Sequence, residues 1–164
     1  MATAVQEANT VKFQQHLAQS GEAVWTVARW LHGTGWYVIV CPVSVTPNYD
    51  ERMKHADAGD LYVKRERAGK AERVEVKRRG VHFTCAEDFP YDDFFVCACH
   101  AWDNATPKPS VFVILNADMT HAGIVEACTH RHWTATMRFD SRYQEYRQNF
   151  YTAPLDKVEF VPLL

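Results

Sequence analysis

Apolar residues recur at helical spacing in the stretch that follows Ser20. The repeating positions are Val24, Val27, Ala28 and Leu31. Ser20 can cap the start of a helix, and Gly33 and Gly35 can end it, so the pattern predicts a helix over residues 21–32. Residues 1–20 are polar and weakly periodic, and we expect them to form a peripheral segment attached to a domain that spans residues 21–164.

The rest of the chain reads mainly as strands. Residues 36–43 form a continuous apolar run, which predicts a strand covered on both faces inside the sheet. Two hairpins are predicted: residues 60–64 with 72–78, turning at Ala68-Gly69, and residues 111–115 with 120–127. Further strands are expected at residues 94–99, 132–139 and 157–161, with a short helix at 141–148. We therefore predict a single α/β domain with a mixed central β-sheet flanked by helices.

The first hairpin places acidic and basic residues on one face. Residues two apart in a strand project to the same side, so Glu75 and Lys77 point away from the apolar Val76. A turn at Ala68-Gly69 sets Asp60 opposite Lys77 and within reach of Glu75. One carboxylate from each strand can then share a cation.

Two clustered carboxylates with room for water suit Mg²⁺ or Mn²⁺ together with substrate phosphate oxygens. Such an ion polarises a phosphate and lowers the pKa of a bound water, while Lys77 beside it can orient that water or neutralise developing charge. The hairpin therefore predicts a site for phosphodiester hydrolysis.

The order of these residues resembles the PD-(D/E)xK nuclease superfamily, which includes restriction endonucleases, Holliday-junction resolvases and phage recombination nucleases. The family's strand-start acid and Glu-x-Lys match Asp60 and Glu75-Val76-Lys77. Glu22 stands where resolvase-like members carry a helical glutamate. The resemblance covers residues 21–79.

This resemblance implies a restriction-endonuclease-like fold and a metal-dependent endonuclease that acts on DNA, of resolvase-like or phage type. It implies metal ligation by Asp60, Glu75 and the Val76 carbonyl, with Glu22 tuning the site or holding a second ion. Members of the family often pair to cut two strands, so a homodimer is expected.

The charge of the chain is distributed unevenly. The net charge is −2, from 18 Lys and Arg against 20 Asp and Glu. Residues 64–79 hold eight basic and three acidic side chains, so this stretch is +5 and the remainder is −7. We expect the basic residues to hold a DNA backbone near the metal. The candidate contacts are Arg65, Arg73, Arg78 and Arg79.

Two other functions fit the sequence. One is a catalytically silent nucleic-acid-binding protein of the same fold. The other is a zinc-stabilised interaction module that uses two clusters of thiols and imidazoles. These clusters are Cys97, Cys99 and His100, and Cys128, His130 and His132.

Composition narrows the class of protein. No apolar run reaches the roughly 18 residues needed to cross a bilayer, and the first ten residues do not read as a signal peptide. The five cysteines are an odd number in a chain of 164 residues that is long enough to bury a core without disulfides. We therefore expect a cytoplasmic protein with reduced thiols and no membrane partner.

Overall fold

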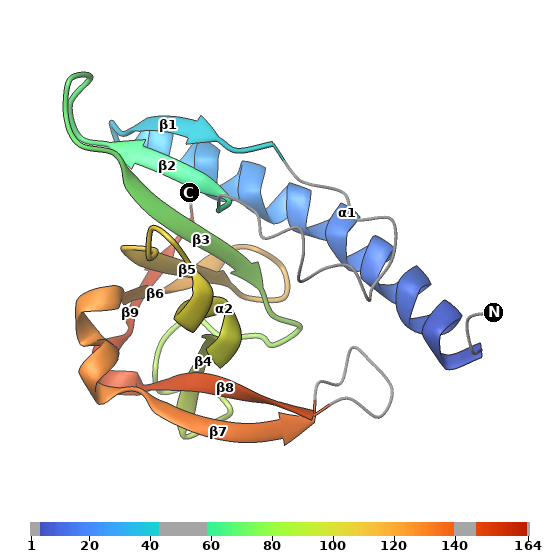
Figure 1. Cartoon of the computed structure of the whole chain (residues 1–164). Helices are drawn as coiled ribbons and strands as arrows, with labels where there is room; N and C mark the ends of the chain where they lie inside the picture. The colour runs from blue at the N-terminus through green and yellow to red at the C-terminus, as the bar shows by residue number, and fades with distance from the viewer. Residues whose placement is uncertain (1–3, 43–58, 140–146, 164) are drawn as a thin grey trace.

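The fold contains a six-stranded sheet, a three-stranded sheet and one long helix (Figure 1). The computed structural model describes residues 4–42, 59–139 and 147–163. The first sheet has the order β1-β2-β3-β5-β6-β9 and the second has the order β4-β8-β7. The strands are β1 Tyr37–Val40, β2 Leu61–Lys64, β3 Glu72–Arg78, β4 Asp93–Ala98, β5 Val111–Leu115, β6 His121–Glu126, β7 Thr134–Phe139, β8 Arg147–Pro154 and β9 Glu159–Pro162. The helical elements are α1 Ala4–Gly33, α2 Cys99–Asn104, η2 Ala127–His132 and η3 Leu155–Lys157.

The larger sheet is mixed, as predicted. Strands β3 and β5 are parallel, and the other neighbouring pairs in this sheet are antiparallel. Parallel strands require a long crossover, and here residues 79–110 supply it, carrying β4 and α2 to the far side of the sheet. The coarse α/β prediction is confirmed. Helices do not cover both faces, however, because the three-stranded sheet covers the face opposite α1.

Helix α1 packs one side of the larger sheet with the apolar stripe predicted from the sequence. Val24, Val27, Ala28 and Leu31 are all buried there. The helix begins at Ala4 rather than at Gly21, so Ser20 lies inside it and the boundary expected after residue 20 falls within one continuous helix. Residues 4–20 contain no Pro or Gly, and an interior glycine such as Gly21 costs a helix only about 1 kcal/mol.

The apolar run at residues 36–43 forms an edge strand, so the prediction of an interior strand is wrong. Among the described residues, strand β1 pairs only with β2, and its exposed side chains are Tyr37 and Ile39. Val38 and Val40 pack against the α1 core. A short apolar run does not distinguish an edge strand from an interior one, because both need one buried face.

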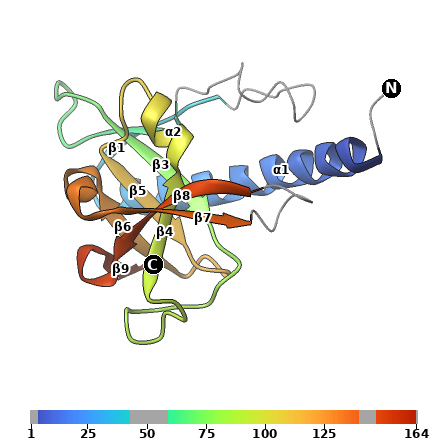
Figure 2. The same cartoon turned by 60° about the horizontal axis from the view of Figure 1, so that its bottom comes forward.

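The second core lies between the two sheets and is rich in aromatic rings. Phe112 and Ile114 of β5 meet Phe94 and Val96 of β4 and the ring of Phe83. Phe83 and Phe94 contact edge to face, with their centroids 5.8 Å apart. This packing fixes the second sheet against the first, and the turned view of Figure 2 shows β4, β8 and β7 in front of the larger sheet.

Two further predictions can be compared with the structure. The hairpin of residues 111–115 with 120–127 is confirmed as β5 and β6. Of the helix predicted at residues 141–148, residues 147 and 148 belong to β8, and the remainder lies outside the described residues.

Gly123 tests the packing between the sheets. A Cβ atom at this position would lie 2.9 Å from Cε2 of Phe94 and closer still to Cζ. We expect Gly123→Ala to lower the free energy of unfolding by about 1–3 kcal/mol, because the buried ring has little room to move. Urea denaturation measures the change.

Gly21→Ala is the matched control, since nothing lies within 4 Å of the added methyl group. Alanine favours a helix interior by up to about 1 kcal/mol, so this variant is expected to be more stable than the parent protein. Equal stability of the two variants would contradict the packing described between β4 and β6.

Candidate functional site

Strand β3 separates its side chains cleanly between the two faces of the sheet. Val74 and Val76 are buried against α1. The alternate positions, Arg73, Glu75 and Lys77, project to the opposite face, where β5 supplies Phe112 beside Glu75 and Ile114 beside Lys77. The predicted separation of Glu75 and Lys77 from Val76 is therefore present.

Asp60 immediately precedes β2 and lies beside the Glu75-Val76-Lys77 segment. The side chains of Leu61 and Val63 enter the α1 core, so Asp60 points to the face that carries Glu75. Its Oδ2 atom accepts a hydrogen bond of 2.7 Å from the backbone N–H of Val76. This bond fixes the aspartate carboxylate at the centre of the Glu-x-Lys segment.

The predicted register of this hairpin is wrong by two residues. Leu61 pairs with Val74, so extension of the register by one step places Asp60 opposite Glu75 rather than Lys77. The turn closes with a bond from the N–H of Gly69 to the carbonyl of Glu66, which centres it one position before Ala68-Gly69. Because the slip is an even number of residues, every side chain stays on its predicted face.

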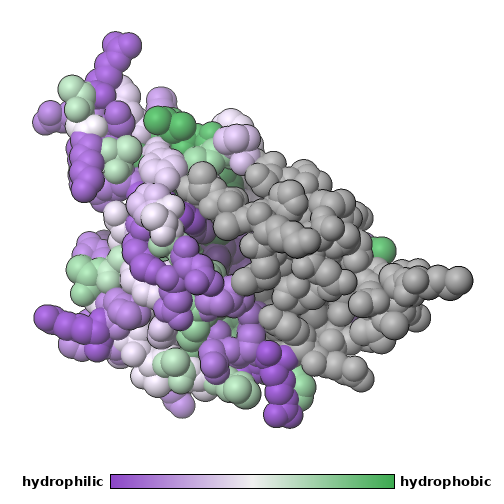
Figure 3. Space-filling view, viewed as in Figure 1, coloured by the Kyte–Doolittle hydropathy of each residue, from purple (hydrophilic) through white to green (hydrophobic). Residues whose placement is uncertain are grey.

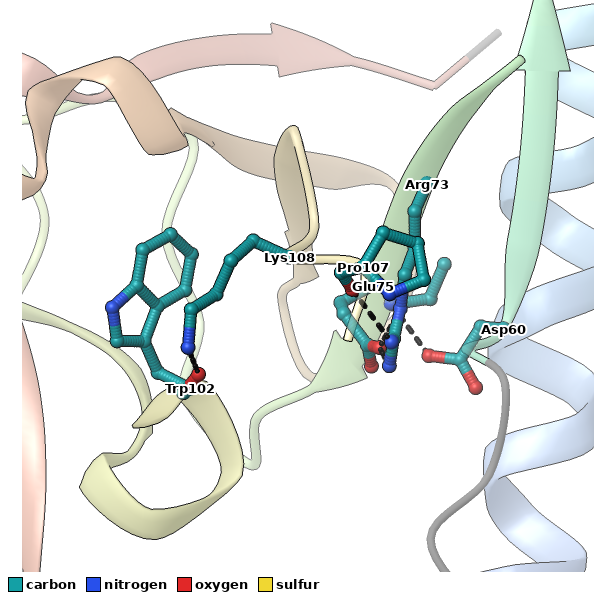
Figure 4. A network of polar contacts seen from close by, with 7 residues as sticks. Asp60, Arg73, Glu75, Trp102, Pro107 and Lys108 are labelled. Carbon is teal, nitrogen blue, oxygen red and sulfur yellow. Dashed lines mark hydrogen bonds and ion pairs between the residues drawn. The ribbon is translucent and has the colours of Figure 1, made fainter. Parts of the chain in front are cut away.

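A buried ion pair between Arg73 and Glu75 dominates the electrostatics of the site (Figure 4). Nε of Arg73 donates to Oε1 of Glu75 at 3.0 Å, and Nη2 binds the same oxygen. Nη1 donates to the carbonyl of Pro107 at 3.0 Å. The two side chains are 7% and 13% exposed, so each charge depends on the other for compensation.

The absence of a side chain at Gly59 leaves room for the Arg73 side chain. Its φ of +100° is a conformation that favours glycine. A Cβ atom there would lie 2.5 Å from Nε of Arg73. The glycine that precedes the candidate aspartate therefore provides space for the guanidinium that binds the candidate glutamate.

Cys97 of β4 lies close enough to the site for the charges of Glu75 and Lys77 to affect the pKa of its thiol. Burial raises the pKa of its thiol to about 12. The positive charge of Lys77 opposes this shift, the negative charge of Glu75 adds to it, and Arg79 again lowers the pKa. The thiol is thus a neutral, buried neighbour of the Glu75 and Lys77 side chains.

Glu22 does not lie beside Asp60, Glu75 and Lys77. It projects from α1, is exposed, and pairs with Arg78, whose Nη1 is 3.9 Å from Oε2 of Glu22. Arg78 also donates to the carbonyl of Ala117. Arg78 alternates with Lys77, so this pair belongs to the α1 side of the sheet, whereas Asp60, Glu75 and Lys77 share the opposite side.

The other predicted DNA contacts have different surroundings. Arg73 is buried in the ion pair, so the expected contact with a DNA backbone is not available to it in this conformation. The guanidinium of Arg65 lies 4.1 Å from the ring centroid of Trp36, and that of Arg79 lies 5.4 Å from the centroid of Phe95. The outer end of the hairpin is hydrophilic, as Figure 3 shows at upper left.

The zinc alternative gains no support from the described residues, in which no three His, Cys, Asp or Glu side chains form a metal-binding group. Cys97 is part of the core between the sheets. His130 is stacked on Trp102, with 4.8 Å between the ring centroids. Asp88 accepts hydrogen bonds from the backbone of Thr84 and Cys85, which lower its pKa to about 2.

An open cavity of about 450 Å³ adjoins the loop that carries Pro107. Its lining includes Trp102, Lys108, Glu72 and Glu126. The ammonium of Lys108 lies 5.2 Å from the Trp102 ring, and the two side chains appear beside the ion pair in Figure 4. Trp102 is half-buried because α2 turns its ring against Phe112.

No family model, curated protein or solved structure matches this chain at a significant level. Within the described residues, no helix is long and apolar enough to cross a membrane.

Arg73 is the residue of this site whose role we did not predict. The spacing of Arg73 and Glu75 could have indicated this role, because two residues two positions apart in a strand project from the same face. What the sequence does not show is that both side chains are buried.

Removing one member of the Arg73–Glu75 ion pair is expected to destabilise the fold. Arg73→Ala leaves the largely buried Glu75 without the guanidinium that compensates its charge, so we expect the free energy of unfolding to fall by about 3 kcal/mol or more. Adding Glu75→Ala to that variant removes the stranded charge, so the double variant is expected to lose less than the sum of the two single variants. Urea denaturation of the four proteins measures the coupling. Additive losses would show that the two side chains do not stabilise each other.

The raised pKa of Cys97 predicts a stability change at alkaline pH. An unperturbed thiol ionises near pH 9, whereas the folded thiol keeps its proton to about pH 12. The unfolded state therefore loses its proton first, and the free energy of unfolding falls above pH 9 by up to about 1.4 kcal/mol per pH unit. Comparison of urea unfolding near pH 8 and near pH 11 tests this. Cys97→Ala should show a smaller loss, and an identical loss would contradict the assignment.

Proposed function

We propose that this chain is a divalent-metal-dependent nuclease that hydrolyses phosphodiester bonds of DNA, with Asp60, Glu75 and Lys77 at its centre. One observation carries the proposal. The hydrogen bond from the N–H of Val76 to Asp60 joins the acid of one strand to the middle of the Glu-x-Lys segment on the next. These three side chains share one face of the sheet although 15 positions separate Asp60 from Glu75.

The donor set fits Mg²⁺ or Mn²⁺ better than a metal that needs an all-protein cage. Oε1 of Glu75 is bound to Arg73 and Oδ2 of Asp60 is bound to Val76, so each carboxylate is oriented through one oxygen. Ligand carboxylates are commonly held in this way by a second hydrogen bond. Mg²⁺ needs only one or two carboxylates, because waters and substrate phosphate complete its coordination.

A bound ion would supply Lewis-acid polarisation of the scissile phosphate and a more acidic water. The chain itself supplies the remaining parts. Asp60 and Glu75 would hold the ion, and Lys77 would orient the attacking water or stabilise negative charge that develops on the phosphate. The side chain of Val76 is buried, so its expected contribution is limited to the backbone carbonyl.

The expected role of Glu22 in tuning the site or holding a second ion stays a prediction. Its ion pair with Arg78 places it near the end of β3. The resolvase-like or phage-type character, membership of the PD-(D/E)xK superfamily and a homodimeric state are likewise proposals. They draw on the order of α1, β1 and the β2–β3 hairpin.

A catalytically silent nucleic-acid-binding protein is the second candidate, and the Arg73–Glu75 pair favours it. A buried guanidinium already compensates the charge of Glu75. If the guanidinium takes the place of the ion at Glu75, Asp60 is the remaining carboxylate of the site, and one carboxylate is a weak anchor for a metal.

Cleavage of labelled DNA tests the proposal. We expect cleavage in Mg²⁺ or Mn²⁺, none in excess EDTA, and a loss of at least about 100-fold for Asp60→Asn or Lys77→Ala, because each removes charge stabilisation at the reacting phosphate. Circular dichroism should confirm that both variants fold.

Glu72→Gln is the matched control, because Glu72 is an exposed carboxylate on the same strand. It is expected to cleave at the parental rate. A parent protein that binds DNA but cuts none of the linear, branched and single-stranded forms with either metal would favour the silent alternative.

A further inference from the structure

Two arginines from different parts of the fold lie against one phenylalanine ring. The guanidinium of Arg79, just after β3, is 5.4 Å from the ring centroid of Phe95 in β4. The guanidinium of Arg138 in β7 is 4.8 Å from the same centroid. Phe95 is itself held edge to face by Phe150 of β8, with 5.6 Å between the centroids. The ring thus fixes the relative position of two cations that lie about sixty residues apart in sequence.

The first of these arginines continues the row of the candidate site. Alternation along β3 places Arg79 on the same side as Glu75 and Lys77, and its N–H bonds to the carbonyl of Leu115, which extends the pairing of β3 with β5 by one step. Positive groups therefore run from Lys77 to Arg79 and, across Phe95, to Arg138. This row joins the larger sheet to the smaller one.

The far end of the β7–β8 hairpin carries a similar pair on the other face of the sheet, because Phe139 directly follows Arg138 and neighbouring residues of a strand project to opposite sides. The guanidinium of Arg147 lies 4.1 Å from the ring centroid of Phe139, and these two residues are paired across the strands. Phe139 and the neighbouring Met137 are each 63% exposed. In Figure 2 the two strands run side by side outward from β4, which places this end away from the aromatic core.

The hairpin strands carry no opposing charge. Neither Thr134–Phe139 nor Arg147–Pro154 contains an Asp or a Glu, while both Arg138 and Arg147 are exposed. Their remaining exposed polar residues, which include Thr134 and Asn149, are neutral hydrogen-bonding groups. Guanidinium groups beside exposed aromatic rings suit a polyanion with stackable bases, since arginine binds phosphate and an aromatic face stacks on any base.

We propose that Arg79 and Arg138, positioned by Phe95, form a contact surface for a nucleic-acid strand that leads from the candidate site onto the second sheet. The phosphate backbone would follow the two arginines. This inference rests on the proposed function for the identity of the polyanion as DNA. It assigns a role to residues beyond position 79, which the resemblance to nucleases does not cover.

Binding of fluorescein-labelled DNA to the full chain in EDTA tests this surface without cleavage. We expect Arg138→Ala to weaken binding about 3- to 10-fold and to reduce the dependence of log Kd on log salt by about one. The Arg138 side chain is exposed, so the variant should fold. Arg131→Ala is the control, because Arg131 is an exposed arginine at the opposite end of β7 and its loss changes the net charge equally.

The proposal is overturned if the Arg138 variant matches Arg131→Ala in affinity and salt dependence, or if the parent protein does not bind the labelled DNA. Binding of anionic vesicles in place of DNA would also overturn it. Loss of cleavage in Mg²⁺ with intact, Arg138-dependent binding would instead count against the proposed hydrolysis and leave this surface supported.

Discussion

The arrangement of the candidate site depends on the burial of one arginine beside one glutamate. Isolated charges cannot be buried without a large desolvation penalty, so Arg73 and Glu75 must remain together wherever the fold places them. The same guanidinium reaches Pro107 and occupies the space left by Gly59. A single side chain therefore connects strand β3, the start of strand β2 and the loop that precedes β5.

This interaction has opposite meanings for the two functional candidates. In a nuclease, Arg73 orients one oxygen of Glu75 and leaves the other toward the ion, as a hydrogen-bonded ligand carboxylate requires. In a silent DNA-binding protein, the guanidinium takes the place of the ion. The carboxylate of Asp60, fixed by the N–H of Val76, is compatible with both interpretations.

Much of the first half of the fold could be predicted from local patterns. The buried stripe of α1 follows from spacing near 3.6 residues, and the shared face of Asp60, Glu75 and Lys77 follows from alternation, which survives the two-residue register error. The edge position of β1 and the three-stranded second sheet were not predictable, because they depend on which strands meet after the chain has crossed over. Likewise, the sequence shows Arg73 and Glu75 two positions apart but not that the loop at Pro107 covers them.

Gly59 also bears on how movement could be transmitted through the protein. Its missing side chain and its φ of +100° let the backbone lie directly against the Arg73 guanidinium. Two groups in such close contact cannot move independently, so a ligand that displaced the peptide before Asp60 would also displace Arg73 and release one oxygen of Glu75. A change in the backbone just before β2 would therefore also change the charge around Glu75 on β3.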